Sequence, residues 1–372
     1  MKFLCLKKGI FFSFLLMFFF LGCKDKNKEN TNLDKPILDS VSVSLFARQI
    51  QSSVNEATPD FFNTSFDKAY IKSVISRNSI VYSSLDSDFG RDYFENNFKI
   101  GDFSVSAIEN GGDFRFVRYY QKDGKHHVIF RTYQDFGMII NDFWVDTVKG
   151  ELKIKDGFIY NLSTSFSNQV CYNVLFEVMN KTNPEGTTKI ILDAQNLLKN
   201  GKSKEAKCLL LKNKELLKEY PYYWQLFIQS IYESDKQNFV SELEKLRADG
   251  FDERSISLHK LLYYSNSGMV AEVENIVNQL IEETGDDPIY LLFFGKANFY
   301  AGNYHDALFC YNEAEKGMPM IWDLWYGKLE CYAKLNDKTN FDNSLKLAQT
   351  VYKMNAEEIN KFVKTNFPGM IK

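Results

Sequence analysis

The segment ELKIKDGFIYNL, residues 151–162, carries the clearest structural signal in this sequence. Apolar side chains occupy most of the even-numbered positions in it, and charged side chains stand on both sides of the first two. Successive side chains of a β-strand point to opposite faces of a sheet. The alternation therefore predicts a strand with one buried face and one solvated face. The apolar set is Leu152, Ile154, Phe158, Tyr160 and Leu162, and the charged set is Glu151, Lys153 and Lys155.

Three more strands are predicted upstream, separated by tight turns. The dipeptide Asp123-Gly124 between two β-rich runs is a strong hairpin signal, because both residue types tolerate the positive φ of a short turn. Gly137 and the pair Lys149-Gly150 mark the next two turns. Such short connections predict an antiparallel meander with strands at 113–121, 126–133 and 138–148.

The residues before the sheet are predicted to be helical. Leu45, Phe46, Ile50 and Val54 fall at helical spacing, and a second helical stretch follows Pro59. Helices followed by an antiparallel sheet indicate an α+β domain over residues 40–182, in which the helices cover one face of the sheet.

The run IFRTYQDFGMIINDFWVDTVKGELKIKDGFIYNLSTSFS, residues 129–167, resembles the sheet of the nuclear transport factor 2-like, or cystatin-like cone, family. The likeness lies in its Phe-Arg strand, Gly-centred turn, polar-aromatic strand and Lys-Ile-Lys-Asp-Gly-Phe strand. Upstream, FFNTSFD at residues 61–67 is similar to the entry helices of bacterial versions fused to repeats. The resemblance implies a cone-like α+β domain.

From residue 186 onward, turn signals recur at a nearly constant spacing of about 34 residues, which is typical of tetratricopeptide repeats. They lie at Gly201, Ser234-Asp235, Gly268, Gly302 and Asn336. The best unit is 288–321, where Gly295 and Ala307 stand at the small positions that let paired helices approach closely. Residues 183–372 are therefore predicted to form an all-α, tetratricopeptide-like helical repeat array of about five helix pairs.

Stacked helix pairs form a curved array with a concave surface, which commonly holds an extended peptide or a partner helix. The first helix of each pair would supply most of that surface. An alternative is that the repeats only pack against the preceding domain. The candidate exposed contacts for a protein or peptide partner are Gln225, Lys260, Asn298 and Lys328.

The first residues read as an export signal. Residues 1–9 carry three lysines and no acid, residues 10–21 are almost entirely apolar, and Gly22 precedes Cys23. This resembles a bacterial lipoprotein signal peptide over residues 1–22, in which the cysteine thiol is acylated. An ordinary secretory signal with a coincidental cysteine is the alternative, since Phe20 and Leu21 fit the lipoprotein pattern loosely.

Residues 23–39 would then be the acylated cysteine and a flexible, charged tether. A lipid on Cys23 predicts a protein of the bacterial cell envelope, anchored to the outer membrane on its periplasmic or surface side. The formal net charge is −3, and the three lysines of the signal peptide leave −6 for the remainder. This balance argues against nucleic acid as a partner.

Four cysteines follow Cys23, at positions 171, 208, 310 and 331. Their wide spacing does not fit a metal site. Buried free thiols are the favoured interpretation, and a disulfide between Cys310 and Cys331 is the alternative.

The sequence contains neither the G-x-S-x-G pattern of serine hydrolases, nor the H-E-x-x-H pattern of zinc peptidases, nor a Walker loop for nucleotide phosphates. No cofactor or enzyme activity is predicted. His127, Arg131 and Asp142 on neighbouring strands are the nearest candidates for a pocket. We expect a non-catalytic, lipid-anchored protein whose repeat array binds a protein or peptide partner or scaffolds a complex. The alternative is a small-ligand-binding or enzymatic cone domain tethered to the membrane. Its pocket would be lined by Tyr119, Phe130, Phe143, Trp144 and Phe158.

Overall fold

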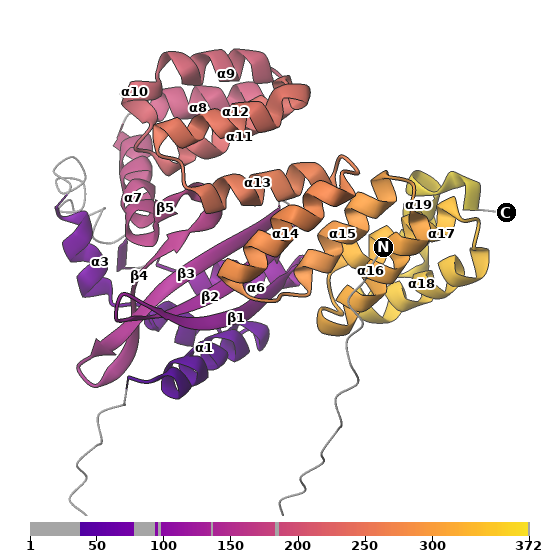
Figure 1. The fold of residues 1–372 in the computed structure, drawn as a ribbon, viewed down its shortest axis with the longest axis horizontal. Coiled ribbons are helices and arrows are strands. Elements are labelled where there is room, and N and C mark those ends of the chain that lie inside the picture. The colour runs from indigo at the N-terminus through magenta and orange to yellow at the C-terminus, as the bar shows by residue number, and fades with distance from the viewer. Residues whose placement is uncertain (1–37, 78–93, 96–97, 135–136, 183–185, 371–372) are drawn as a thin grey trace, which may run out of the picture. The chain divides into compact units, whose positions relative to one another are not determined.

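An antiparallel sheet forms the centre of the α+β part of the protein. The computed structural model describes residues 38–77, 94–95, 98–134, 137–182 and 186–370, so the predicted signal peptide, Cys23 and most of the tether lie outside the described residues. The strands run in chain order across the sheet, and each pairs antiparallel with the next (Figure 1). They are β1 (Asp113–Lys122), β2 (Lys125–Gln134), β3 (Gly137–Val148), β4 (Glu151–Ile159) and β5 (Thr164–Ser165).

The turns between these strands have the backbone that the sequence predicted. Asp123 and Gly124 have φ of 51° and 73°, and Lys149 and Gly150 have φ of 51° and 88°. Two successive positive φ values are characteristic of the hairpin turn that matches the twist of the strands it joins. The predicted meander is confirmed.

The strand β4 contains a β-bulge. Ile154 pairs with Val145, but the next pair is Asp156 with Trp144, so Lys155 is an extra residue on β4. An extra residue shifts the alternation of side chains by one position.

As a consequence, the apolar residues of this segment are divided between two cores. Leu152 and Ile154 pack in the core on one face of the sheet, whereas Phe158 and Tyr160 pack in the core on the other. The strand ends at Ile159, and Tyr160–Leu162 form the 3₁₀ helix η1. The predicted single apolar face is therefore wrong, because the bulge reverses the alternation.

The first core lies between the sheet and helices α1, α2, α3, α6 and α7 of the described chain, and it is rich in phenylalanine. The rings of Phe114 and Phe130 stack 5.3 Å apart, and Phe62 contacts both of them. Leu45, expected on the buried face of its helix, is instead 56% exposed. The helices are α1 (Ser40–Asn55), α2 (Asp60–Thr64), α3 (Lys68–Ile75), α6 (Ile100–Glu109) and α7 (Phe166–Thr182).

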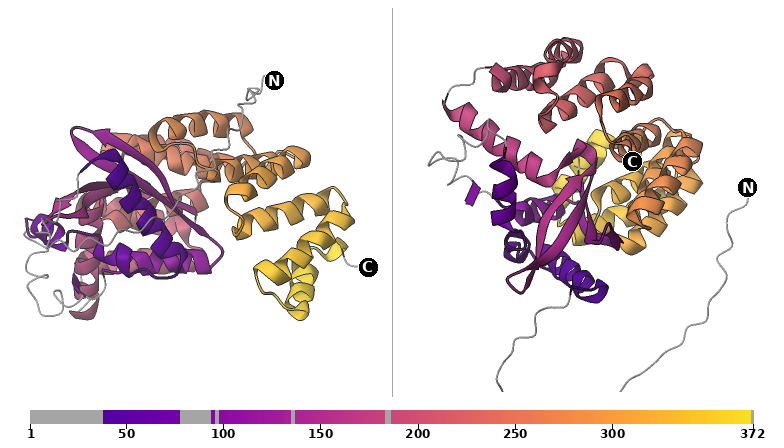
Figure 2. Two further views of the ribbon diagram at one scale, coloured as in Figure 1. Left: turned by 90° about the horizontal axis from the view of Figure 1, so that it is seen from below. Right: turned by 60° about the vertical axis from the view of Figure 1, so that its left-hand side comes forward.

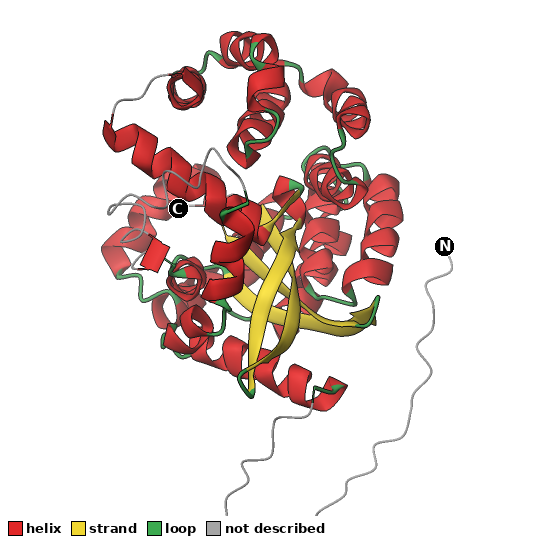
Figure 3. Cartoon of the chain, turned by 90° about the vertical axis from the view of Figure 1, so that its left-hand side faces the viewer, coloured by secondary structure: helices red, strands yellow, loops and turns green. Residues whose placement is uncertain are grey.

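The second face of the sheet is covered by the helical array. Ile129, Tyr133 and Ile140 from the strands share one core with Leu261 and Phe293 from the array. Figure 3 shows helices on both sides of the sheet. The expectation that one face is solvated is therefore wrong: the array supplies a second apolar layer for it.

The array consists of successive helix pairs, and its turns lie where the sequence placed them. Helices α18 and α19 extend beyond the sheet (Figure 2). The pairs are α8 (Gly186–Lys199) with α9 (Ser203–Lys212), α11 (Pro221–Ser234) with α12 (Phe239–Leu246), α13 (Glu253–Ser265) with α14 (Val270–Thr284), α15 (Ile289–Tyr300) with α16 (Tyr304–Gly317), and α17 (Trp322–Lys334) with α18 (Lys338–Val351). The short α10 (Lys214–Leu217) precedes α11, and α19 (Ala356–Asn366) follows the last pair.

The ring of Tyr311 on α16 explains why small residues occur in this part of the array. A Cβ added to Gly295 on α15 would lie 2.3 Å from that ring, and one added to Gly327 on α17 would lie 2.7 Å from it. Tyr311 thus fills the space left by a glycine on each neighbouring helix. The close approach predicted at Gly295 and Ala307 is confirmed, with Ala307 fully buried.

Candidate functional site

A cavity of about 840 Å³ opens where the sheet meets α7 and the array. Its walls are the end of β2, the start of β3, the end of β4 with η1, and residues of α6, α7, α11, α12, α13 and α15. We call this cavity the cleft. The helices α11, α13 and α15 are each the first helix of a pair, which is where the sequence placed the partner-binding surface.

The lining of the cleft combines side-chain amides with aromatic rings. Tyr133, Tyr222, Tyr232 and Tyr263 contribute rings, and the described lining residues include neither Asp nor Glu. Each amide offers both a hydrogen-bond donor and an acceptor, which suits an uncharged polar ligand such as a polypeptide backbone. The amides are Asn141, Asn161, Gln169, Asn173, Gln225, Gln229 and Asn266.

His259 stands in the wall of the cleft on α13. Its Nε2 lies 3.2 Å from the backbone oxygen of Asn161. Burial lowers the pKa of His259 to about 4, against the smaller opposing effect of that hydrogen bond. The imidazole is therefore neutral at pH 7, and its Nε2–H donates to the carbonyl.

Lys296 is the charged residue at the array end of the cleft. Its Nζ donates to Asp323 Oδ2 at 2.5 Å and to the Tyr133 hydroxyl at 3.2 Å. Tyr133 donates in turn to the same carboxylate oxygen at 2.5 Å. Burial favours the neutral form of Asp323, but Lys296 and these hydrogen bonds outweigh it and lower the pKa of Asp323. The network ties β2 to α15 and α17 at the cleft.

The four predicted partner contacts have different positions. Gln225 is exposed and lines the cleft, whereas Lys260 is half-buried and forms an ion pair with Glu244. Asn298 and Lys328 are buried, so their predicted exposure is wrong. Asn298 donates to the backbone oxygen of Phe294 at 3.0 Å, and Lys328 donates to Glu315 at 2.6 Å. These two side chains bond within the array rather than project from it.

His127 and Asp142 form a pair on the face of the sheet that the array covers. The Nδ1 atom of His127 lies 2.9 Å from Asp142 Oδ1. Tyr120 stacks on the imidazole with ring centroids 4.8 Å apart and donates its hydroxyl hydrogen to Asp142 Oδ2. Burial, together with the Asp142 carboxylate, raises the pKa of Tyr120. An aspartate that orients a histidine can support general-base chemistry, but neither residue lines the cleft.

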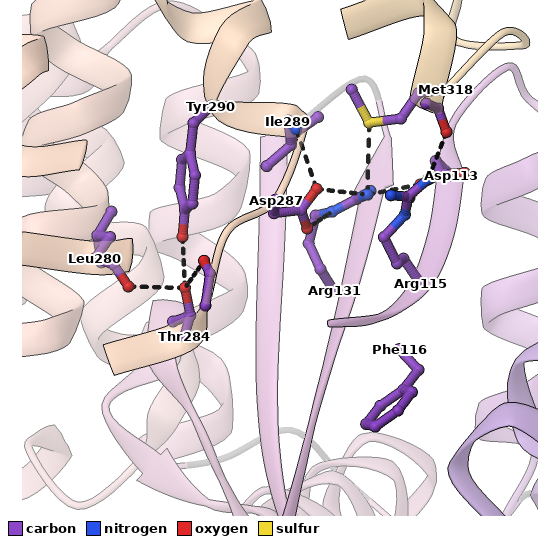
Figure 4. Close-up of polar contacts among 12 residues, drawn as sticks. Asp113, Arg115, Phe116, Arg131, Leu280, Thr284, Asp287, Ile289, Tyr290 and Met318 are labelled. Atoms are coloured by element: carbon purple, nitrogen blue, oxygen red, sulfur yellow. Dashed lines mark hydrogen bonds and ion pairs between the residues drawn. The ribbon is translucent and has the colours of Figure 1, made fainter. Parts of the chain in front are cut away.

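Arg131 joins the sheet to the array instead of lining a pocket. Its guanidinium is 1% exposed, and its Nε donates to Asp287 Oδ2 at 2.8 Å. Its Nη2 donates to Asp113 Oδ2 at 2.7 Å and approaches the sulfur of Met318. Figure 4 shows this arginine reaching from β2 to Asp287, directly before α15.

Other features bear on chemistry within the described part of the chain. Cys171, Cys208, Cys310 and Cys331 are all free. Cys171 and Cys331 are buried as expected, but Cys208 is exposed and Cys310 is half-buried, which corrects the expectation that all four are buried. Among the described residues, no group of three or more His, Cys, Asp or Glu side chains could hold a metal ion. The helices described are too short or too polar to cross a membrane.

Most residues of the cleft could not be named from the sequence. Gln225 was anticipated from its helix, but Tyr232, Tyr263 and Asn141 were not. One signal was available, because aromatic residues are frequent on the first helices of the repeats. The sequence does not specify how the array packs on the sheet, and the cleft forms only where the two meet. Comparisons with protein-family models, curated proteins and solved structures find no match for this chain.

Proposed function

We propose that this protein is a non-catalytic, lipid-anchored protein of the bacterial envelope that binds a segment of a partner protein in the cleft. In this proposal the α+β part is a cone-like domain of the nuclear transport factor 2-like type, and the array is tetratricopeptide-like. Acylated Cys23 and the tether hold both at the outer membrane.

The observation that carries the proposal is the composition of the cleft wall. Seven amide side chains and four tyrosines surround a space of about 840 Å³, with Lys296 already neutralised by Asp323. Peptide groups need paired donors and acceptors, and aromatic rings accept apolar side chains between them. The first helices of helical repeats are a frequent site for such segments.

The position of the ionisable side chains favours binding over catalysis. His127 and Asp142 bind each other, and Arg131 binds Asp287 and Asp113; all three lie on the covered face of the sheet and outside the cleft wall. His259, which is in that wall, donates to a backbone carbonyl. A cavity of this volume also suits a small organic ligand, which is the second candidate, and the experiment below separates the two.

The test is site-specific photo-crosslinking in intact cells. A photoreactive phenylalanine replaces Gln225 or Gln229 in the cleft, and the matched control replaces Gln349, an exposed glutamine of α18 outside the cleft. We expect one crosslinked species, common to the two cleft positions and absent at Gln349. The additional substitution Asn266→Trp, which introduces an indole ring into the cleft wall, should lower the yield of this species.

Crosslinks of equal yield at all three positions, or a crosslink yield that Asn266→Trp leaves unchanged, would contradict the proposal. A complete lack of protein crosslinks would favour the small-ligand alternative. The anchor is tested separately by metabolic labelling with a clickable fatty acid, comparing the native chain with Cys23→Ser. Labelling that does not depend on Cys23 would refute the anchor.

A further inference from the structure

The Lys296–Asp323 ion pair marks the place where the cleft meets the parallel first helices α15 and α17. Its Nζ–Oδ2 distance of 2.5 Å fixes these two helices side by side. One helical turn beyond this pair, α15 presents Tyr300, and α17 presents Tyr326 and then Glu330. Residues three or four apart lie on the same side of a helix, so these side chains follow Lys296 and Asp323 along the two helices. They lie beyond the residues that line the cleft, and the Tyr326 ring also packs against Phe362 and Phe367 of the C-terminal cluster.

Tyr300 is an aromatic surface that is open to a ligand. It is 57% exposed, which is unusual for a tyrosine at the end of an apolar helix. Burial and then the charge of Glu330 raise the pKa of both Tyr300 and Tyr326. The hydroxyl of Tyr232, which lines the cleft, also acts on Tyr300. Tyr300 thus lies within electrostatic range of a residue of the cleft wall and of Glu330.

Glu330 is half-buried and forms neither an ion pair nor a side-chain hydrogen bond with the residues that the structure describes. Burial raises its pKa to about 6, while Lys296 and Lys334 act in the opposite direction. Lys296 is engaged by Asp323, and Lys334 is exposed one turn further along α17. A carboxylate that is partly removed from water and has no ion-pair partner is stabilised when a cation binds to it.

We propose that Tyr300, Tyr326 and Glu330 form a subsite for one basic side chain, lysine or arginine, of the polypeptide segment bound in the cleft. The carboxylate supplies the opposite charge, and the exposed tyrosine ring supplies a face for the cation. This inference rests on the proposed function, and it names a required feature of the partner: a basic residue next to an uncharged stretch.

The subsite is tested directly with small probes on the full chain. The probes are N-acetyl-arginine amide and its neutral isostere N-acetyl-citrulline amide, with binding measured by ligand-observed NMR at low ionic strength. We expect the arginine probe to bind at least about fivefold more tightly than the citrulline probe. Glu330→Gln should remove this preference, and the matched control Glu274→Gln, an exposed glutamate of α14, should retain it.

Two more variants show whether Tyr300 and Lys334 strengthen or weaken binding of the arginine probe. Tyr300→Ala should weaken the arginine probe by about threefold, because the ring face is lost. Lys334→Ala should strengthen it, because an intramolecular competitor for Glu330 is removed. Equal binding of both probes to the native protein, or an undiminished preference in Glu330→Gln, would overturn the subsite. Thermal unfolding of each variant confirms that it is folded.

The failure of this inference can be distinguished from the failure of the proposed function. If crosslinking from Gln229 captures a partner but neither probe is preferred, the cleft binds a segment and the subsite is wrong. If the arginine preference depends on Glu330 but no partner is crosslinked from the cleft, the subsite is correct and the partner-binding role is wrong.

Discussion

Breaking the ion pair between Arg131 and Asp287 should destabilise the whole described chain. Arg131 is 1% exposed and Asp287 is 2% exposed. Removing Arg131 would leave Asp287 as a buried charge, and removing Asp287 would leave the buried guanidinium with only the more exposed Asp113 as an ion-pair partner. Removing one partner of a buried pair typically costs about 3–5 kcal/mol. We expect a loss of this size for Arg131→Met and for Asp287→Asn. Asp113, the second partner of Arg131, is 24% exposed, so Asp113→Asn should cost only about 1 kcal/mol.

The double variant Arg131→Met with Asp287→Asn separates the pair from its surroundings. Replacing both charges leaves no uncompensated ion, and asparagine keeps an acceptor for the Ile289 N–H that Asp287 Oδ1 binds at 3.0 Å. We therefore expect the double variant to be no less stable than either single variant. Within the double-mutant cycle this corresponds to an interaction energy of about 3 kcal/mol.

Urea unfolding followed by circular dichroism and by tryptophan fluorescence measures these free energies. Hydrogen exchange adds the location, because loss of the pair should increase exchange in β2 and in the first turns of α15. Single variants that each cost less than about 1 kcal/mol, or effects that simply add in the double variant, would refute the reasoning. The first result would mean that the array stays on the sheet without this pair, and the second would mean that the two side chains contribute independently of each other.

Two other predictions follow from buried groups. The pKa of His259 is about 4 when folded and 6.5 ordinarily, so the unfolded chain binds the proton more tightly. The stabilisation is complete above pH 6.5 and is lost as the pH falls towards 4, by at most about 3 kcal/mol. His259→Gln should flatten this part of the pH–stability curve, and an unchanged curve would contradict the assignment. Gly295→Ala should lower stability by about 1–3 kcal/mol through contact with Tyr311, although alanine favours helix. Thermal unfolding should show partial recovery when Tyr311→Leu is added, and a variant as stable as the native protein would argue against the close packing.

The local parts of the fold could be predicted because short-range chemistry determines them. Asp123-Gly124 and Gly302 stand at turns because few residues accept a positive φ, and the structure has φ of 73° at Gly124 and 84° at Gly302. The faces of the sheet could not be predicted in the same way. The bulge at Lys155 reverses the alternation of β4, and the apolar residues on both sides of it resemble one continuous strand.

The candidate site was predictable only to the level of the helices that supply it. Gln225 and Asn298 occupy first helices as expected, but the rotation of each helix about its axis depends on what it packs against. Asn298 faces its own helix pair, whereas Gln225 faces the cleft. The pairing of Arg131 with Asp287 spans 156 residues, and nothing in the sequence near either residue specifies its partner.

The buried pair and the cleft are connected through α15. Asp287 holds Arg131 of β2 and also accepts the N–H of Ile289, so the first turn of α15 is fixed to the sheet. The same helix carries Phe293 and Lys296 into the cleft wall. A wall that is already rigid does not have to be ordered when a ligand binds, which favours affinity. The double variant, which removes both charges without leaving a buried ion, should therefore loosen α15. We expect it to reduce crosslinking from Gln229 more than Asp113→Asn does at equal protein levels. Equal yields in the two variants would mean that the Lys296–Asp323–Tyr133 network alone holds this wall in place.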